Sequence, residues 1–308
     1  MADDELSSRS GHDPQGSARM VVAALDGSSH EAAVLAWASA FALRHHVAHE
    51  LVHVVDVGVS LTPYAVIATE APWFGEQLEA STRARLEQLA ATVRTKHPDL
   101  EVRVRTPFGS PSGVLVSLSE RAAAVVVGAS THDRLERLVL GSTALAVVAH
   151  GHGTVVVVPE SLPPVEPHRV VVGADGSDAG GRALAAAVEE AATVGGSVTA
   201  VTAWTLEIED GIVVTEPGSA RWARVESRLA EATRGALEAA RAAHPDVAVD
   251  VLVRNEKPAT ALLAVAAERG ADLVVVGRRG RGGFTGLLMG SVSRTVVQRS
   301  SVPVAVVH

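Results

Sequence analysis

The chain contains one sequence pattern twice, and the spacing of the two copies limits what it can fold into. Short motifs recur 149 residues further along: Asp26-Gly27-Ser28 as Asp175-Gly176-Ser177, Gly128 as Gly277, and Gly141-Ser142 as Gly290-Ser291. His97-Pro98-Asp99 recurs as His244-Pro245-Asp246 at an offset of 147, so the copies differ by small insertions. Such a repeat is far longer than a solenoid unit, and we expect each copy to be a domain with its own core.

The repeat also sets the expected domain boundaries. We predict domains at residues 19–159 and 168–308, joined by a linker at 160–167 that is rich in proline and glutamate. The first residues are polar and include the acids Asp3 and Asp4, where a secretory signal would carry basic residues. We therefore expect residues 1–18 to form a disordered tail.

Composition excludes several classes of site and partner. The chain has no cysteine, which excludes disulfides, thiolate metal sites and cysteine nucleophiles. The net charge is −8 and the aromatic residues are only 4 Trp, 4 Phe and 1 Tyr, which argues against a nucleic-acid partner. No uncharged apolar run is long enough to span a membrane, so we expect a cytoplasmic protein.

Valine-rich runs alternate with alanine-rich helical stretches in each copy. The strands expected in the first copy are Met20–Leu25, Glu50–Val55, Leu100–Arg105, Ala123–Val127 and Thr154–Val158. Those expected in the second are Arg169–Ala174, Ser197–Trp204, Val247–Val253, Ala271–Val276 and Pro303–Val307, with helices starting near Asp178, Gly218, Pro258 and Gly290. Continuous valine runs indicate strands covered on both faces, so each copy is predicted to be an α/β domain with a five-stranded parallel sheet flanked by helices.

Glycines follow the first and fourth strands, at the sheet edge where α/β proteins bind ligands. In the second copy their spacing is Gly-x2-Gly-x9-Gly-Ser, from Gly277 through Gly280 to Gly290. Glycine lets the backbone approach a ligand closely, and the free N–H groups at a helix N-terminus favour phosphate. We therefore predict an anion site here, the alternative being a flexible, solvated loop.

The local charge supports the anion site. No Asp or Glu occurs from Leu273 to His308, although the whole chain is acidic. The same segment carries five arginines, namely Arg278, Arg279, Arg281, Arg294 and Arg299. A global excess of acids therefore does not exclude a phosphate ligand.

The segment Val274–Phe284 with Gly290–Ser293, together with Asp175 after the first strand, resembles the ATP-binding branch of the universal stress protein family. The resemblance covers Met20–His308 as a tandem pair and implies a Rossmann-like fold with strand order 3-2-1-4-5 in each copy. The fifth strand in this family commonly pairs with that of another domain, which implies pairing of Thr154–Val158 with Pro303–Val307. It also implies a homodimer.

The resemblance further implies which residues bind a cofactor, namely ATP or a related adenine nucleotide, with Mg²⁺ where phosphates gather. In the second copy they are Asp175, Gly176, Ala203, Gly277, Arg278, Gly280, Arg281, Gly290, Ser291, Val292 and Ser293. In the first copy they are Asp26, Gly27, Val54, Gly128, Thr131, Gly141, Ser142 and Thr143. Asp175 and Ala203, like Asp26 and Val54, would contact the adenine end.

The first copy departs from the family pattern at Thr131, which replaces the middle glycine. The same loop carries the acids Asp133 and Glu136, which would repel phosphate. We therefore predict weaker nucleotide binding in the first copy than in the second.

Three functions are compatible with these residues. The first is a regulatory sensor that signals through nucleotide occupancy, with the role in stress, hypoxia or dormancy that the resemblance implies. The second is a slow ATPase, although no acid near Gly277–Ser291 offers a general base. The third is an interaction scaffold in which the nucleotide is incidental, with an unknown downstream partner.

One motif points to different chemistry. His49-Glu50-Leu51-Val52-His53 matches the His-Glu-x-x-His pattern of zinc proteases, which places both histidines on one face of a helix. Here the segment is predicted to be a strand, where His49 and His53 would stand about 13 Å apart, too far for one metal ion. The serine of each Asp-Gly-Ser is interpreted as a helix cap, the alternative being a nucleophile. Trp73 and Trp222 are interpreted as residues that pack a helix onto the sheet, the alternative being that they shield an adenine.

Overall fold

The computed structural model describes residues 19–56, 72–129, 140–160, 166–281 and 288–308, and for 72–76 only the backbone. The expected tail, most of the expected linker, Thr131, Asp133, Glu136 and the side chain of Trp73 lie outside the described residues.

The elements of the first copy are β1 (Met20–Ala24), α1 (Glu31–His45), β2 (Ala48–Val52), α4 (Pro72–Lys96), β3 (Val102–Arg105), α5 (Pro111–Ser119), β4 (Ala124–Gly128), α6 (Ser142–His150) and β5 (Thr154–Val158). Those of the second copy are β6 (Arg169–Gly173), α7 (Asp178–Thr193), β7 (Ser197–Trp204), β8 (Ile208–Glu209), β9 (Ile212–Val213), α8 (Ala220–Ala243), β10 (Ala248–Asn255), α9 (Pro258–Arg269), β11 (Leu273–Gly277), α10 (Ser291–Arg299) and β12 (Val304–Val307).

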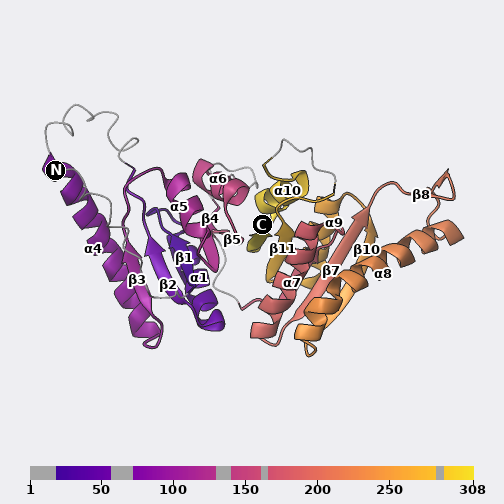
Figure 1. Ribbon diagram of the computed structural model, residues 1–308, viewed down its shortest axis with the longest axis horizontal. Helices are drawn as coiled ribbons and strands as arrows, with labels where there is room; N and C mark the ends of the chain where they lie inside the picture. The colour runs from indigo at the N-terminus through magenta and orange to yellow at the C-terminus, as the bar shows by residue number, and fades with distance from the viewer. Residues whose placement is uncertain (1–18, 57–71, 130–139, 161–165, 282–287) are drawn as a thin grey trace, which may run out of the picture.

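A single ten-stranded sheet runs through both copies, in the order β10-β7-β6-β11-β12-β5-β4-β1-β2-β3 (Figure 1). Within each copy neighbouring strands are parallel, and counting along that copy gives the order 3-2-1-4-5. The copies join where β12 runs antiparallel to β5, with Val304 opposite Val157 and Val307 opposite Thr154. The α/β architecture predicted from the valine runs is therefore confirmed.

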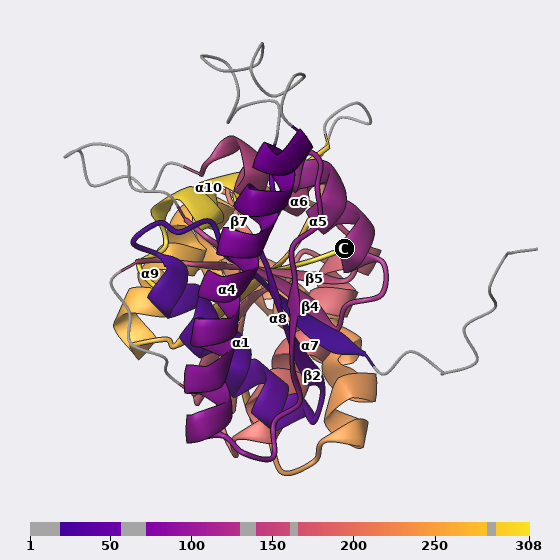
Figure 2. The same ribbon diagram turned by 90° about the vertical axis from the view of Figure 1, so that its left-hand side faces the viewer.

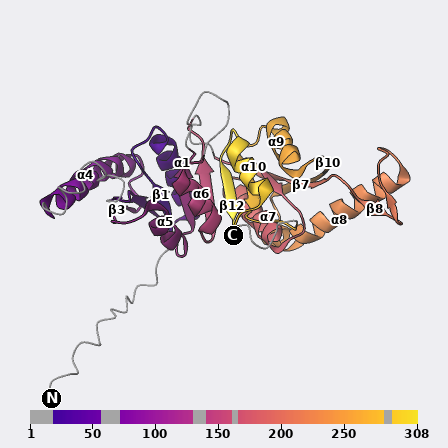
Figure 3. The same cartoon turned by 90° about the horizontal axis from the view of Figure 1, so that it is seen from above.

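Helices cover both faces of this sheet in two apolar layers. One layer packs residues of α1, α4, α7 and α8 against the sheet, including Trp37, Leu86, Leu184 and Leu237. The other packs α5, α6, α9 and α10. Figure 2 shows α4 as the outermost helix of the first copy, and Figure 3 shows α6 and α10 near β12 in the middle of the molecule. Both layers draw residues from both copies, so the two cores meet at the junction of β5 and β12.

Sequence signals explain where several helices begin and end. Pro111 and Pro258 occupy the first turn of α5 and α9, where a missing N–H costs nothing. The hydroxyl of Ser219 accepts from Trp222 N at 3.2 Å and so caps α8. Gly270 ends α9 at a φ of 56°. No helix among the described residues is long and apolar enough to cross a membrane.

Polar contacts also cross the junction between the copies. The carboxylate of Glu190 on α7 accepts from Arg44 Nη2 at 3.2 Å and lies 2.8 Å from His45 Nε2, both at the end of α1. On the other side of the sheet, Arg278 Nη1 donates to the carbonyl of Ala149 at 3.2 Å. The side chain of His308 lies 2.9 Å from the carbonyl of Val148. The last turn of α6 is thus contacted by two residues of the second copy.

Candidate functional site

The Asp-Gly-Ser motifs form the same turn in both copies, directly after β1 and β6. Ser28 N donates to Asp26 Oδ1 at 3.0 Å, and Ser177 N donates to Asp175 Oδ1 at 3.0 Å. The glycine between them has a φ of +80° at Gly27 and +71° at Gly176. Only glycine adopts such a conformation without strain, which is why the motif is repeated.

In the second copy the glycine-rich loop hydrogen-bonds to this turn through Arg281. Arg281 N donates to Asp175 Oδ2 at 2.8 Å, and its guanidinium donates to the carbonyl of Gly176 at 2.9 Å. Asp175 Oδ1 also accepts from the hydroxyl of Ser177 at 2.6 Å. A Cβ on Gly280 would collide with Asp175 Oδ2. Both carboxylate oxygens of Asp175 are therefore engaged within the protein.

The glycine that ends the fourth strand has a packing role in both copies. A Cβ on Gly277 would lie 2.8 Å from the backbone of Ala179 in the first turn of α7. A Cβ on Gly128 would lie 2.7 Å from that of His30, which precedes α1. Contacts this short do not occur between real Cβ atoms and their neighbours. The close approach of strand and helix therefore requires glycine at these positions, whether or not a ligand binds beside them.

Two helices begin beside these turns without a side-chain cap. Gly141 precedes α6 and Gly290 precedes α10, and neither helix has an acid in its first turn. Ser142 and Ser291 are exposed at these ends, and Thr143 and Val292 follow half-buried. A helix N-terminus of this kind favours an anion, because its first N–H groups have no partner within the helix.

Two residues predicted to bind a cofactor in the second copy have side chains that hydrogen-bond within the protein. The hydroxyl of Ser293 is buried and donates to the carbonyls of Arg278 and Gly290, at 2.9 and 3.0 Å. The guanidinium of Arg278 extends to Ala149 in the first copy, and burial, together with Arg279 and Arg182, lowers its pKa.

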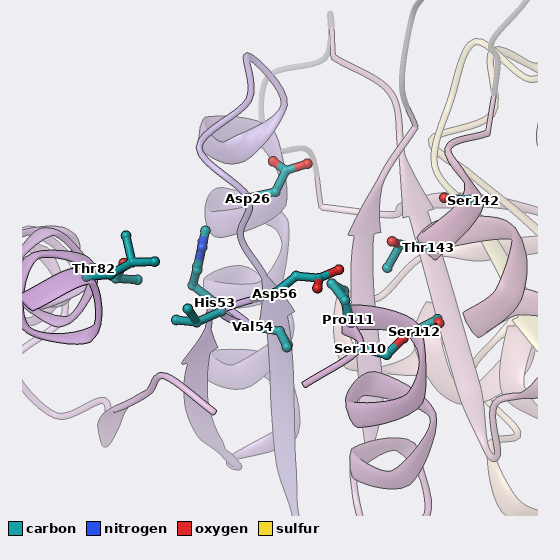
Figure 4. Close-up of a pocket in the computed structure, with 12 residues that line it drawn as sticks. Asp26, His53, Val54, Asp56, Thr82, Ser110, Pro111, Ser112, Ser142 and Thr143 are labelled. Atoms are coloured by element: carbon teal, nitrogen blue, oxygen red, sulfur yellow. Dashed lines mark hydrogen bonds between the residues drawn. The ribbon is translucent and has the colours of Figure 1, made fainter. Parts of the chain in front are cut away.

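A cavity of about 530 Å³ opens at the carboxyl ends of β1 and β2 in the first copy (Figure 4). The described residues that line it are Asp26, His53, Val54, Val55, Asp56, Leu78, Thr82, Ser110, Pro111, Ser112, Ser142 and Thr143. Four of the predicted positions, Asp26, Val54, Ser142 and Thr143, meet here. Gly27, Gly128 and Gly141 support the surrounding backbone and are not among these lining residues.

Sequence reasoning missed the side of the cavity that α4 and α5 form. Ser110, Pro111 and Ser112 belong to the start of α5, and Leu78 and Thr82 come from α4. The Ser-Pro pair after the third strand marked a helix start that faces the same edge of the sheet. The residues of α4 carried no such signal, because nothing local separates a helix residue beside a cavity from one in solvent.

The surroundings of two groups on the cavity wall shift their pKa values. Burial alone would raise the pKa of Asp26, but hydrogen bonds from Ser28, together with the electrostatic effect of the nearby His30, outweigh it and hold that pKa below its ordinary value. Burial lowers the pKa of His53, and Arg85, which lies 3.3 Å from His53 Nδ1, lowers it further. At neutral pH the wall therefore presents an ionised carboxylate beside a neutral imidazole.

The His-Glu-x-x-His sequence does not lie on a helix. His49 is on β2, where its Nδ1 lies 3.3 Å from the hydroxyl of Ser39, and His53 follows the strand. The two imidazoles thus have separate partners, Ser39 and Arg85. Within the part of the chain that the structure describes, no three His, Asp or Glu side chains gather in a way that could hold a metal ion.

Comparison with known proteins agrees with this tandem architecture. The sequence pattern of the universal stress protein family matches residues 18–159 and again residues 167–308. The chain belongs to the universal stress protein family. A universal stress protein of Mycobacterium tuberculosis is 34% identical over 93% of this chain and 96% of its own length. One from Mycolicibacterium smegmatis is 32% identical over 94% and 96%.

A solved structure shares the fold of this universal stress protein. A universal stress protein from Archaeoglobus fulgidus covers 94% of this chain and 98% of its own chain, with a TM-score of 0.66 and 21% identity. The match extends over both copies, so it supports the tandem α/β arrangement described above. The family resemblance stated from the glycine motif is confirmed, and the roles of individual residues rest on the geometry of the cavity.

Proposed function

We propose that this universal stress protein binds an adenine nucleotide in the first-copy cavity and acts as a nucleotide-responsive regulator. The observation that carries the proposal is the cavity itself, which connects Asp26 and the end of β2 to the N-terminus of α6. A nucleotide needs a recess for its base beside donors for its phosphates. This cavity offers both.

The chemistry of the walls fits that division. Val54 and Val55 form an apolar wall for a base, and the Asp26 carboxylate can accept from an exocyclic amino group. Ser142 and Thr143 bring hydroxyls to an uncapped helix N-terminus, where the helix dipole favours phosphate. The volume of about 530 Å³ lies within the range of small-molecule sites, about 300–1,000 Å³.

The expected ranking of the two copies is reversed in this proposal. The glycines and arginines of the second-copy loop favour tighter binding there, but Asp175 accepts from Arg281 N in addition to the serine contact that Asp26 also has. The described residues bring no three metal ligands together. The proposal therefore assigns Mg²⁺ to the phosphates of the nucleotide rather than to a site on the protein.

Thr143→Asp tests the proposal at the phosphate end. A carboxylate in the first turn of α6 complements the helix dipole, so the fold should be retained, but it repels a phosphate at the same place. We expect ATP affinity, measured by isothermal titration calorimetry, to fall at least about tenfold, and adenosine affinity to stay unchanged. Val292→Asp, at the matching position of α10, is the control.

Two outcomes would contradict the proposal. One is an unmodified protein that binds no adenine nucleotide at millimolar concentration. The other is a Thr143→Asp variant with unchanged ATP affinity. Mass spectrometry of small molecules released from the denatured, purified protein would identify a nucleotide that accompanies it.

A further inference from the structure

A second cavity lies where the two copies meet, on the face of the sheet that α1 and α7 cover. Its volume is about 450 Å³, and none of its described lining residues lines the first-copy cavity. Its floor is the pairing of β5 with β12, where Val156 is opposite Ala305, and α1 and α7 lie on either side (Figure 1). We call it the seam cavity. In the first copy it reaches the residues before β1, β4 and β5, at the opposite ends of the strands from the first-copy cavity.

The two walls of the seam cavity differ, although the repeat relates them. The offset of 149 holds from the Asp-Gly-Ser turns before α1 and α7 to the strands β2 and β7 after them. Trp37 of α1 therefore corresponds to Ala186 of α7. Phe41 corresponds to Glu190, and all four residues line the cavity. An alanine opposite an indole leaves space that a second indole would fill, so the cavity depends on this difference between the copies.

The inner part of the seam cavity is apolar and partly aromatic. The rings of Trp37 and Phe41 are stacked with 5.5 Å between centroids, and the ring of His45 follows at 4.0 Å from that of Phe41. The strands contribute the aliphatic side chains of Val156, Leu273, Val275 and Ala305. Recesses of this size with such a lining bind apolar ligands, because water gains few hydrogen bonds inside them.

Apart from the imidazole of His45, acids and bases balance around this interior. Glu190 is paired with Arg44, whose Nη2 lies 3.2 Å from its carboxylate. The other charged lining residues are exposed and make no ion pair within the described part of the chain, namely Arg19, Arg121, Glu120 and Glu189. A strongly charged ligand such as a polyphosphate would be attracted by half of these groups and repelled by the other half. The lining therefore favours a ligand without net charge.

We propose that the seam cavity binds a small apolar molecule that carries no net charge. Such a ligand contacts α1 of the first copy and α7 of the second at the same time, so its binding stabilises the contact between the copies. The site is distinct from the nucleotide site proposed above, because the two cavities lie at opposite strand ends and have separate linings. The two proposals can therefore be tested independently.

N-phenyl-1-naphthylamine, an uncharged aromatic dye that fluoresces in apolar surroundings, is the probe. We expect one dye per unmodified chain in a fluorescence titration, and we expect saturating ATP to leave it bound. Ala186→Trp gives the second copy the residue that the first copy has, and it should weaken dye binding at least about tenfold. Ala185→Trp, at the exposed neighbouring position of α7, is the matched control.

Two further measurements make the test specific. Because a tryptophan at position 186 can prevent folding, Ala186→Leu fills the cavity more mildly, and circular dichroism verifies that each variant is folded. The dye 8-anilino-1-naphthalenesulfonate is the same molecule with one added sulfonate. We expect it to bind more weakly than the uncharged dye, because the charges around the cavity offer no net attraction.

Each outcome decides a distinct point. Dye binding that is unchanged in folded Ala186→Trp and Ala186→Leu proteins, or that ATP displaces, would place the dye elsewhere and overturn the inference. Tighter binding of the sulfonate than of the uncharged dye would overturn the assignment of a ligand without net charge. A chain that binds ATP but no dye would overturn this inference alone. A chain that binds the dye at the seam but no adenine nucleotide would support it and contradict the proposed function.

Discussion

Replacing Glu190 by glutamine should weaken the junction between the two copies. The Glu190 carboxylate accepts from Arg44 and His45 of the other copy, and the side chains of Glu190 and Arg44 are only 12% and 7% exposed. Glutamine keeps the size and one acceptor oxygen but removes the charge. The guanidinium of Arg44 would then stay buried without a counter-ion.

The structure sets the size of the expected loss. Arg44 Nε and Nη1 are buried without a hydrogen-bond partner, so among the described residues Glu190, which accepts from Nη2, is the acceptor that this guanidinium has. The rings of Trp37 and Phe41, 5.7 and 6.0 Å from the guanidinium carbon, remain as weaker partners. Removing one member of a buried ion pair costs about 3–5 kcal/mol, and because the amide keeps one acceptor we expect about 3 kcal/mol.

Urea unfolding followed by far-UV circular dichroism measures this loss. Glu189→Gln is the matched control, because Glu189 is the exposed neighbour on the same helix and its change should stay within about 0.5 kcal/mol. A Glu190→Gln protein as stable as the Glu189→Gln protein would refute the view that this ion pair holds the copies together.

Two further predictions concern stability. Burial lowers the pKa of His49 to about 4, so below its unfolded value of about 6.5 the unfolded chain takes up the proton first. Stability should therefore fall by about 2 kcal/mol between pH 7 and pH 5 in urea titrations. His49→Val should remove that component, and an unchanged pH dependence would contradict the assignment. Gly277→Ala should destabilise by more than about 1 kcal/mol because its Cβ meets the backbone of Ala179. Gly181→Ala, where a Cβ meets nothing within 4 Å in α7, should stabilise by about 0.5–1 kcal/mol in urea unfolding, and equal free energies of unfolding for the two glycine variants would count against this reasoning.

Much of the fold could be predicted because its signals are local and repeated. The valine runs placed all ten strands of the main sheet to within a few residues, and the duplicated motifs marked the edge where the cavity lies. The short hairpin of β8 and β9 was missed, since two-residue strands show no periodicity. Its signal was the Asp210-Gly211 pair, whose φ values of 53° and 75° are those of a two-residue hairpin turn.

The site could be predicted only in part, because its shape depends on residues far apart in the sequence. The glycine motif predicted a site in the second copy. There Gly277 and Gly280 lack a Cβ and so allow Ala179 and Asp175 to approach the backbone closely. The contact of Arg278 with Ala149 depends on how the copies pack, which no local pattern encodes. The cavity likewise depends on how several helices and strands pack around it, so no single segment of the sequence predicts it.

The antiparallel pairing of β5 with β12 has a consequence for the quaternary structure. Both halves of this seam belong to one backbone, so dilution cannot separate them, unlike a seam between two chains. In the part of the chain that the structure describes, the strands at the edges of the ten-stranded sheet are β3 and β10, and a further chain that extended this sheet by strand addition would pair with one of them. One half can also change by mutation without altering the other, a freedom that two identical subunits do not have.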